Sequence, residues 1–155
     1  MRHALDEIDL RILEILQQDA RLTNKQIAEK IGKSVTPVFE RIKKLEREGY
    51  IQQYVAVLNS KMIGKGLAAY AHVQLRQHDH ATIAKFENIV THFPEIMECY
   101  RMAGEYDYLM NIVVRDMDEF NDFVVKKLSH VFDLGTVQTY FVMNEMKKTV
   151  SYKAG

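Results

Sequence analysis

Basic side chains are concentrated in one part of an otherwise neutral chain. The 155 residues carry 21 Lys and Arg and 21 Asp and Glu, yet residues 21–47 hold eight basic side chains against three acidic ones. A local excess of positive charge attracts a polyanion, because contacts to phosphates act within a Debye length of about 10 Å. The chemistry this stretch favours is nucleic-acid binding, and the bland alternative is a solvated, lysine-rich helical face.

Within this stretch, a helix after Ser34 presents a polar face. If Val35, Ile42 and Leu45 turn inward, together with Val38 or Phe39, the opposite side presents polar groups that suit a DNA groove. Small hydroxyls suit base edges, the planar guanidinium suits guanine or phosphate, and lysines suit the phosphate backbone. The predicted DNA-binding residues, which include Lys25 on the preceding helix, are Lys25, Lys33, Ser34, Thr36, Pro37, Glu40, Arg41 and Lys44.

Three short helices are predicted to position these residues. Asp6 caps a first helix with Ile8, Ile12, Ile15 and Leu16 on one face. Thr23 and Gln26 have capping-box spacing for a second helix that ends at Gly32. Ser34 can cap the third, which tolerates Pro37 in its first turn and ends at Gly49. Two helices joined by a tight glycine turn predict a helix-turn-helix.

After Gly49 the periodicity changes, and the pattern predicts an α+β fold. Residues 50–58 resemble a connecting strand, and 59–66 a hinge. A ferredoxin-like βαββαβ order follows. The expected elements are strands at 69–76, 96–102, 108–114 and 136–146, and helices at 81–92 and 117–131, the second opened by an Asp116–Glu119 capping box. The expected domains are 1–50 (helix-turn-helix, winged-helix-like), 51–66 (strand linker and hinge) and 67–155 (regulatory and dimerisation).

Two helices protect only one face of a four-stranded sheet. The residues expected to point away from them are Ala71, Val73, Leu75, Ile112 and Val114. An apolar patch of that size usually meets a partner, so we expect an obligate homodimer formed through the sheets, with two DNA-reading heads.

Two motifs in this order resemble those of a known family. The runs Arg21–Ala28 and Gly32–Ile51 look like the DNA-binding head of the leucine-responsive and asparagine (Lrp/AsnC) regulators. Gly104-Glu-Tyr-Asp-Tyr-Leu109 and the ending Thr139–Lys147 look like their second half. The resemblance covers essentially the whole chain.

The resemblance implies a bacterial or archaeal transcription regulator that binds double-stranded DNA. Relatives are dimeric, often octameric, and commonly bind a small amino acid between regulatory domains. Asp107 would pair with its ammonium and the amides around Gly104 with its carboxylate; a turn-capping role for Asp107 is the alternative. The implied effector-binding residues are Met102, Ala103, Gly104, Tyr106, Asp107 and Thr139.

Two departures from the family leave the identity of the effector open. Many relatives have a Pro-Gly-Val turn where this chain has Phe132-Asp133-Leu134, and many have a threonine where Val137 stands. Both positions lie near the presumed wall of the pocket.

The sequence gives weaker support to other classes of function. The start lacks the apolar region of a secretory signal, no apolar run spans a bilayer, and the single cysteine, Cys99, excludes an internal disulfide, so we expect a cytoplasmic protein without a membrane partner. His78-Asp79-His80 favours a polar turn over a metal site. We expect no enzyme, metal or cofactor; a small dimeric α/β-barrel enzyme is an alternative, and an architectural DNA-organising protein without an effector is the stronger competitor.

Overall fold

The computed structural model describes residues 4–129 and 133–152, which form two compact units. The first contains the described residues up to Val57 together with those from Lys147 onward, and the second runs from Leu58 to Met146. The expected second domain included residues 147–152. They group with the first unit, where the backbone of Tyr152 exchanges hydrogen bonds with the Gln17 side chain.

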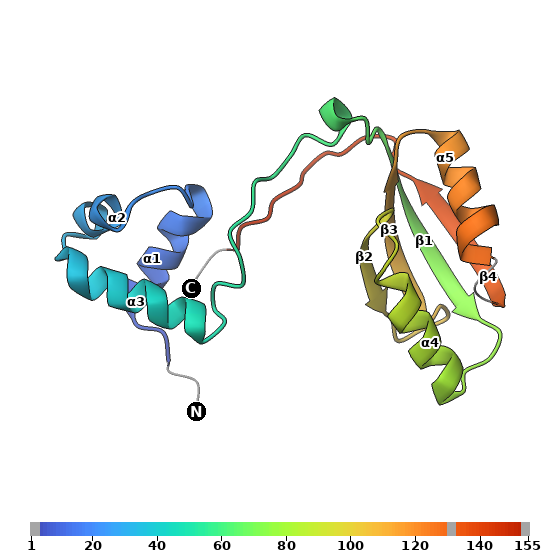
Figure 1. Cartoon of the computed structure of the whole chain (residues 1–155), viewed down its shortest axis with the longest axis horizontal. Helices are drawn as coiled ribbons and strands as arrows, with labels where there is room; N and C mark the ends of the chain where they lie inside the picture. The colour runs from blue at the N-terminus through green and yellow to red at the C-terminus, as the bar shows by residue number, and fades with distance from the viewer. Residues whose placement is uncertain (1–3, 130–132, 153–155) are drawn as a thin grey trace. The chain divides into compact units, whose positions relative to one another are not determined.

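Three helices make up the ordered part of the first unit (Figure 1): α1 (Glu7–Gln18), α2 (Asn24–Ile31) and α3 (Val35–Arg47). Asp6 caps α1, and Thr23 and Gln26 form the predicted reciprocal capping box of α2. Gly32 ends α2 with a φ of 66°, a left-handed conformation that glycine adopts without steric cost. The predicted helix-turn-helix is confirmed.

The core of this unit is small. Its fully buried members come from all three helices: Ile12, Ile27, Ala28, Ile31, Val38, Ile42 and Leu45. Val35 was predicted to turn inward, and this was wrong: its side chain is 44% exposed. Val35 does not belong to the apolar cluster of this unit, in which Val38 is the first member from α3.

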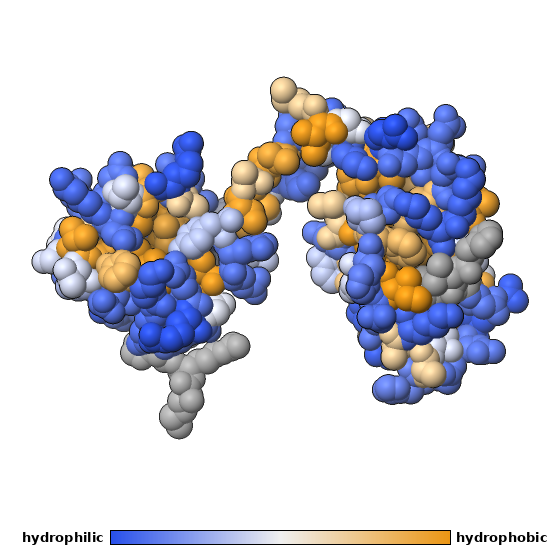
Figure 2. Space-filling view, viewed as in Figure 1, coloured by the Kyte–Doolittle hydropathy of each residue, from blue (hydrophilic) through white to orange (hydrophobic). Residues whose placement is uncertain are grey.

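No regular secondary structure forms in the described segment that joins α3 to the next element, a short 3₁₀ turn at Lys61–Ile63. The predicted strand over 50–58 is therefore wrong. Its β-branched residues lack a neighbouring strand to complete a ladder, and Val55, Val57 and Leu58 are each about two-thirds exposed. Figure 2 shows hydrophobic residues along this segment.

The second unit is an antiparallel sheet with helices on one face (Figure 1). Its strands are β1 (Leu67–Leu75), β2 (Ile96–Arg101), β3 (Tyr108–Val114) and β4 (Leu134–Phe141), in the spatial order β2-β3-β1-β4. The helices are α4 (His80–Val90) and α5 (Met117–Asp122), the latter continued by a π-helical turn, Phe123–Leu128. This is the predicted ferredoxin-like order.

Several predicted ends differ from the structure. Asp79 starts α4 by capping the amides of Ala81 and Thr82. Asp116 caps α5 as predicted, but Glu119 accepts from the amide of Arg115 instead of closing a reciprocal box. β4 ends at Phe141, not at 146, and residues 130–132, which include parts of the predicted helix and of the Phe132–Leu134 turn, lie outside the described residues.

The predicted orientation of the sheet was wrong. Ala71, Val73, Leu75, Ile112 and Val114 face the helices, because they pack in one cluster with Phe86, Val90, Phe120, Phe123 and Leu128. Successive strand residues point to opposite faces, so the other face carries the intervening residues. These are more polar and aromatic: Tyr70, His72, Leu109, Asn111, Gln138 and Tyr140.

Removing Phe86 from the helix-covered core tests this packing. The ring is fully buried, so Phe86→Ala should lower the free energy of unfolding of the second unit by about 3–5 kcal/mol. Met143→Ala removes a side chain that is 100% exposed in the same unit and should leave it unchanged within about 0.5 kcal/mol. Urea unfolding followed by circular dichroism measures both, and equal effects would contradict the packing.

Candidate nucleic-acid interface and effector turn

The first turn of α3 is open to solvent and presents small polar and apolar groups. Ser34, Val35, Thr36 and Pro37 are all exposed. Ser34 occupies the N-cap position, but its hydroxyl makes no capping hydrogen bond. The hydroxyl and the first amides of α3 therefore remain available to a ligand, and helix N-termini favour anions.

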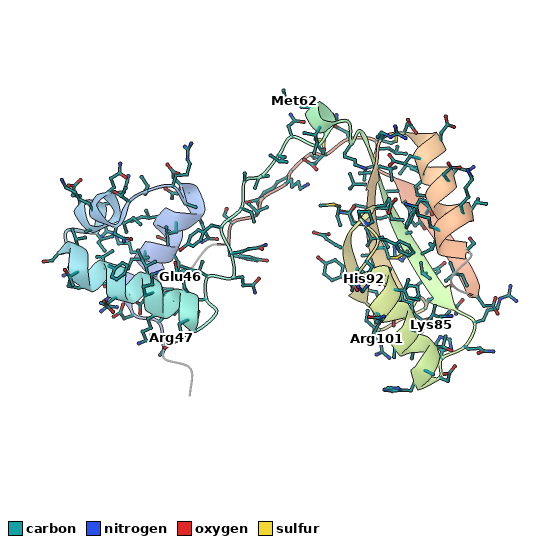
Figure 3. All side chains as sticks on the ribbon, viewed as in Figure 1. Glu46, Arg47, Met62, Lys85, His92 and Arg101 are labelled. Carbon is teal, nitrogen blue, oxygen red and sulfur yellow. The ribbon has the colours of Figure 1, made fainter. Side chains whose placement is uncertain are left out.

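Three lysines that are predicted to contact phosphates have no carboxylate partner among the described residues. Lys25 and Lys33 are exposed and Lys44 is half-buried. Across residues 4–129 and 133–152, no carboxylate lies within ion-pair distance of any of the three. Lys43, by contrast, pairs with Glu46 at 2.9 Å, near the end of α3 where Figure 3 labels Glu46 and Arg47. Contact of these three lysines with phosphates stays a prediction, and a lysine without an intramolecular carboxylate partner suits that role.

Arg41 differs from the other predicted DNA contacts. Its Nη1 lies 2.6 Å from Oδ2 of Asp6 and 2.7 Å from Oδ1 of Asp9, both at the start of α1. Hydrogen bonds with Asp9 and Asp6 raise the pKa of Arg41. A backbone hydrogen bond from Asp9, followed by the bond from Arg41, lowers the pKa of Asp6 from its ordinary value of 3.8. Direct base reading by Arg41 stays a prediction. It would require the guanidinium to leave the bonds that it makes to Asp6 and Asp9 within its own unit.

Tyr54 and Glu46 close a shallow hollow on the same unit. Its walls come from all three helices and its volume is about 250 Å³. The hydroxyl of Tyr54 donates to Glu46 at 3.0 Å, and burial, reinforced by this carboxylate, raises the pKa of Tyr54 to about 12. The hollow is open, and its polar lining groups Lys43, Glu46 and Tyr54 hydrogen-bond to one another.

In the second unit, the turn before β3 is held by Asp107. Its backbone amide donates to the carbonyl of Val73 at 2.9 Å, and its carbonyl accepts from Met102 at 2.7 Å. Its carboxylate Oδ2 accepts from the amide of Leu75 at 2.7 Å, and Nε2 of His78 lies 2.9–3.0 Å from both oxygens. The turn-capping role is therefore real, and a carboxylate with about four lone-pair sites still has capacity for an ammonium donor.

The remaining effector candidates do not converge on one point of this unit. Ala103 and Gly104 lie exposed in the same turn. Tyr106 donates to Gln138 at 2.7 Å and contacts the ring of His72, on the face away from the helices. Thr139 pairs in register with the buried Ala71, on the opposite face.

Sequence reasoning missed one partner of the Asp107 turn, His78. His78 was assigned to a polar turn, and the Asp–His pair joins residues 29 positions apart, so no local spacing signals it. Asp79 of the same tripeptide caps α4. In the described part of the chain, no three His, Cys, Asp or Glu residues are grouped to hold a metal ion.

Cys99 has the character expected of a structural thiol. It packs against the core of the second unit, and burial, followed by the charge of Glu87, raises its pKa. The thiolate is the reactive form, so a raised pKa disfavours nucleophilic chemistry. Among the described helices, none has the length and apolar character that crossing a membrane requires.

A helix-turn-helix joined to a ferredoxin-like unit defines a two-domain DNA-binding protein. The comparisons agree. Residues 5–52 match the winged helix-turn-helix DNA-binding family and residues 68–152 match the Lrp/AsnC ligand binding domain. The chain belongs to the Lrp/AsnC family of transcriptional regulators.

Relatives resemble the chain along nearly its full length. It is 37% identical over 147 residues to the DNA-binding transcriptional activator DecR of Escherichia coli, covering 95% of this chain and 97% of that protein. It is 35% identical to a leucine-responsive regulatory protein of Rhizobium meliloti, covering 95% and 94%. A transcriptional regulator of Neisseria meningitidis, solved in complex with L-methionine, has a TM-score of 0.91 at 34% identity, covering 96% of each chain.

Removing the Asp107 side chain tests its part in the turn without any ligand. Asp107→Ala leaves the buried amide of Leu75 without its acceptor and should destabilise the second unit by about 1–3 kcal/mol. Glu105→Ala, an exposed acid of the same turn, is the matched control and should shift the thermal midpoint little. If the two variants melt alike, Asp107 does not hold the turn.

Proposed function

We propose that this transcriptional regulator reads specific duplex DNA with the N-terminal turn of α3. The observation that carries the proposal is this exposed turn, in which the Ser34 hydroxyl is unused for capping. Lys25, Lys33 and Lys44 of the same unit have no carboxylate partner among the described residues. Recognition helices place their N-terminal residues against base edges in the major groove. Ser34 and Thr36 can bond base edges, and the exposed Val35 and Pro37 suit a thymine methyl.

The proposal assigns the phosphate contacts to three lysines of the DNA-binding unit. Lys25 at the start of α2, Lys33 between the helices and Lys44 on α3 would grip the backbone, and Glu40 would face the groove from the second turn of α3. The proposal assigns no catalysis to the chain and places it in the cytoplasm with its DNA.

A small amino acid is the proposed effector, bound at the turn from Met102 to Asp107. Support comes from the match to a ligand binding domain and from the relative solved with L-methionine. Asp107 would accept the ammonium, amides around Gly104 would donate to the carboxylate, and Ala103 and Tyr106 would line the side chain. Thr139 would take part only from another copy, since it lies on the opposite face from Tyr106.

The open face of the sheet is the proposed dimer surface. Tyr70, His72 and Tyr140 share this face, and His72 contacts the rings of both Tyr106 and Tyr140. Aromatic residues supply much of the binding energy at interfaces. A homodimer places two heads on half-sites about one helical turn, or a multiple, apart, and dimers would assemble further, to an octamer.

Alanine variants separate base reading from backbone contact. Thr36→Ala should weaken binding to a duplex from the chain's own promoter region more than binding to a scrambled duplex. Lys33→Ala should weaken both alike and lower the salt slope by about one. Lys85→Ala, an exposed lysine of α4 labelled in Figure 3, is the control and should change neither.

Fluorescence anisotropy at several salt concentrations measures these affinities. If the wild-type chain bound both duplexes equally, the sequence-specific proposal would be wrong, and an architectural DNA-organising role would replace it.

Thermal shift with the twenty amino acids, beginning with L-methionine, tests the effector. A ligand bound only by the folded form stabilises it by about 2.7 kcal/mol at a hundred times its Kd. The midpoint should rise for at least one amino acid. Asp107→Asn keeps an oxygen for the Leu75 amide but loses the charge, so the rise should disappear. A flat screen of the wild-type chain would contradict the effector proposal.

A further inference from the structure

We propose that Arg41 acts on DNA recognition as a positioning residue, locking α3 to the start of α1 through Asp6 and Asp9 instead of touching the duplex. The inference rests on the proposed reading by α3, and it concerns how that helix is held. Its basis is the three-residue cluster that joins the middle of α3 to the first turn of α1.

Each of the four carboxylate oxygens in this cluster accepts a hydrogen bond. Oδ1 of Asp6 accepts from the amide of Asp9 at 2.9 Å, and Oδ2 of Asp9 accepts from the amide of Asp6 at 3.2 Å. Each carboxylate therefore uses one oxygen for the capping box of α1 and turns the other to Nη1 of Arg41, at 2.6 and 2.7 Å. The guanidinium completes an arrangement that the cap itself prepares.

Burial makes this arrangement costly to leave. Asp9 is only 4% exposed, although it lies in the first turn of a surface helix. If Arg41 moved to a base or phosphate, the Asp9 carboxylate would remain buried without its cation, and an unpaired buried charge is strongly unfavourable. With two acids around one base, the cluster also has a net negative charge, which does not attract phosphate.

The apolar core of the first unit does not by itself fix the rotation and axial position of α3. Val38, Ile42 and Leu45 hold α3 by apolar packing, which is non-directional and tolerates small shifts along the helix axis. A charge-assisted hydrogen bond from the adjacent Arg41 fixes both rotation and axial position. Thr36 lies five residues before Arg41, about 7.5 Å along the axis, so a change in the tilt of α3 displaces the reading residues directly.

The proposal makes a prediction opposite in sign to simple electrostatics. Neutralising an acid on a DNA-binding head removes repulsion from phosphates and should tighten binding. Asp6→Asn and Asp9→Asn should instead weaken binding to the promoter-region duplex roughly tenfold or more, the scale of one lost charge-assisted hydrogen bond. Binding to scrambled DNA should stay equal or become tighter.

The variants are matched to separate the ion pair from the fold. Asn caps helices as well as Asp does, so Asp6→Asn keeps the start of α1 and removes the charge and the oxygen that accepts from Arg41. Glu14→Gln, an exposed acid further along α1, is the control and should leave both affinities unchanged or slightly tighter. Arg41→Lys should recover part of the specific affinity that Arg41→Gln loses, and adding Asp9→Asn to Arg41→Gln should cause little further loss.

Fluorescence anisotropy with both duplexes measures the DNA affinity of each full-length variant, and thermal melting shows whether the variant is folded. Specific loss in the Asp variants with the fold retained supports the positioning role. Asp6→Asn and Asp9→Asn binding the promoter duplex normally or more tightly, whether or not Arg41→Gln loses specificity, would overturn it.

Two further results are also decisive. If Asp9→Asn is unfolded at the assay temperature, Asp6→Asn and Arg41→Lys decide the outcome by the same criteria. If the wild-type chain fails to distinguish the two duplexes, the proposed sequence-specific function fails, which is a different result from a wild-type chain that discriminates and Asp variants that do so equally well.

Discussion

The carboxylate of Asp9 is buried at the start of α1, with the guanidinium of Arg41 against it at 2.7 Å. This contact matters to the DNA-binding unit because the apolar core of that unit is small. Among the described residues it has seven buried members, one of which is an alanine. A core of this size stabilises the three helices but does not by itself fix how far α3 projects. In the arrangement that we propose, the ion pair fixes the position of α3 and leaves its first turn, together with Lys25, Lys33 and Lys44, to contact DNA.

In the second unit, too, a single carboxylate holds a local element in place, here a turn. Its core is larger and lies between the sheet and its two helices, and the turn before β3 depends on one carboxylate that caps the amide of Leu75 and contacts His78. Asp107 is therefore structural before it is anything else. A ligand ammonium arriving there would meet a carboxylate already oriented by the fold, which lowers the cost of binding through pre-organisation.

The sequence predicted the elements better than their surroundings. Local signals, such as the Thr23–Gln26 box, Gly32 and the cap at Asp116, lie within a few residues of one another and identified helix ends correctly. The helix-facing side of the sheet was assigned wrongly, because alternation marks two faces without saying which one the helices cover. The strand over 50–58 failed because strand formation needs a partner that propensity does not supply.

The candidate site shows the same division. Residues of the α3 face were identified by their spacing, whereas the bonds of Arg41 to Asp6 and Asp9 span more than thirty positions and have no local signature. The pairing of His78 with Asp107 escaped for the same reason. Charge type and helical period thus predict which residues share a surface, but only the folded chain shows which of them are already occupied.

The most direct measurement is an experimental structure of the chain bound to a duplex from its own promoter region. The account predicts Ser34 and Thr36 within hydrogen-bond distance of base edges in the major groove, and Nη1 of Arg41 still within hydrogen-bond distance of Asp9. A guanidinium that has left Asp9 for a guanine or a phosphate, or an α3 that faces away from the groove, would contradict it.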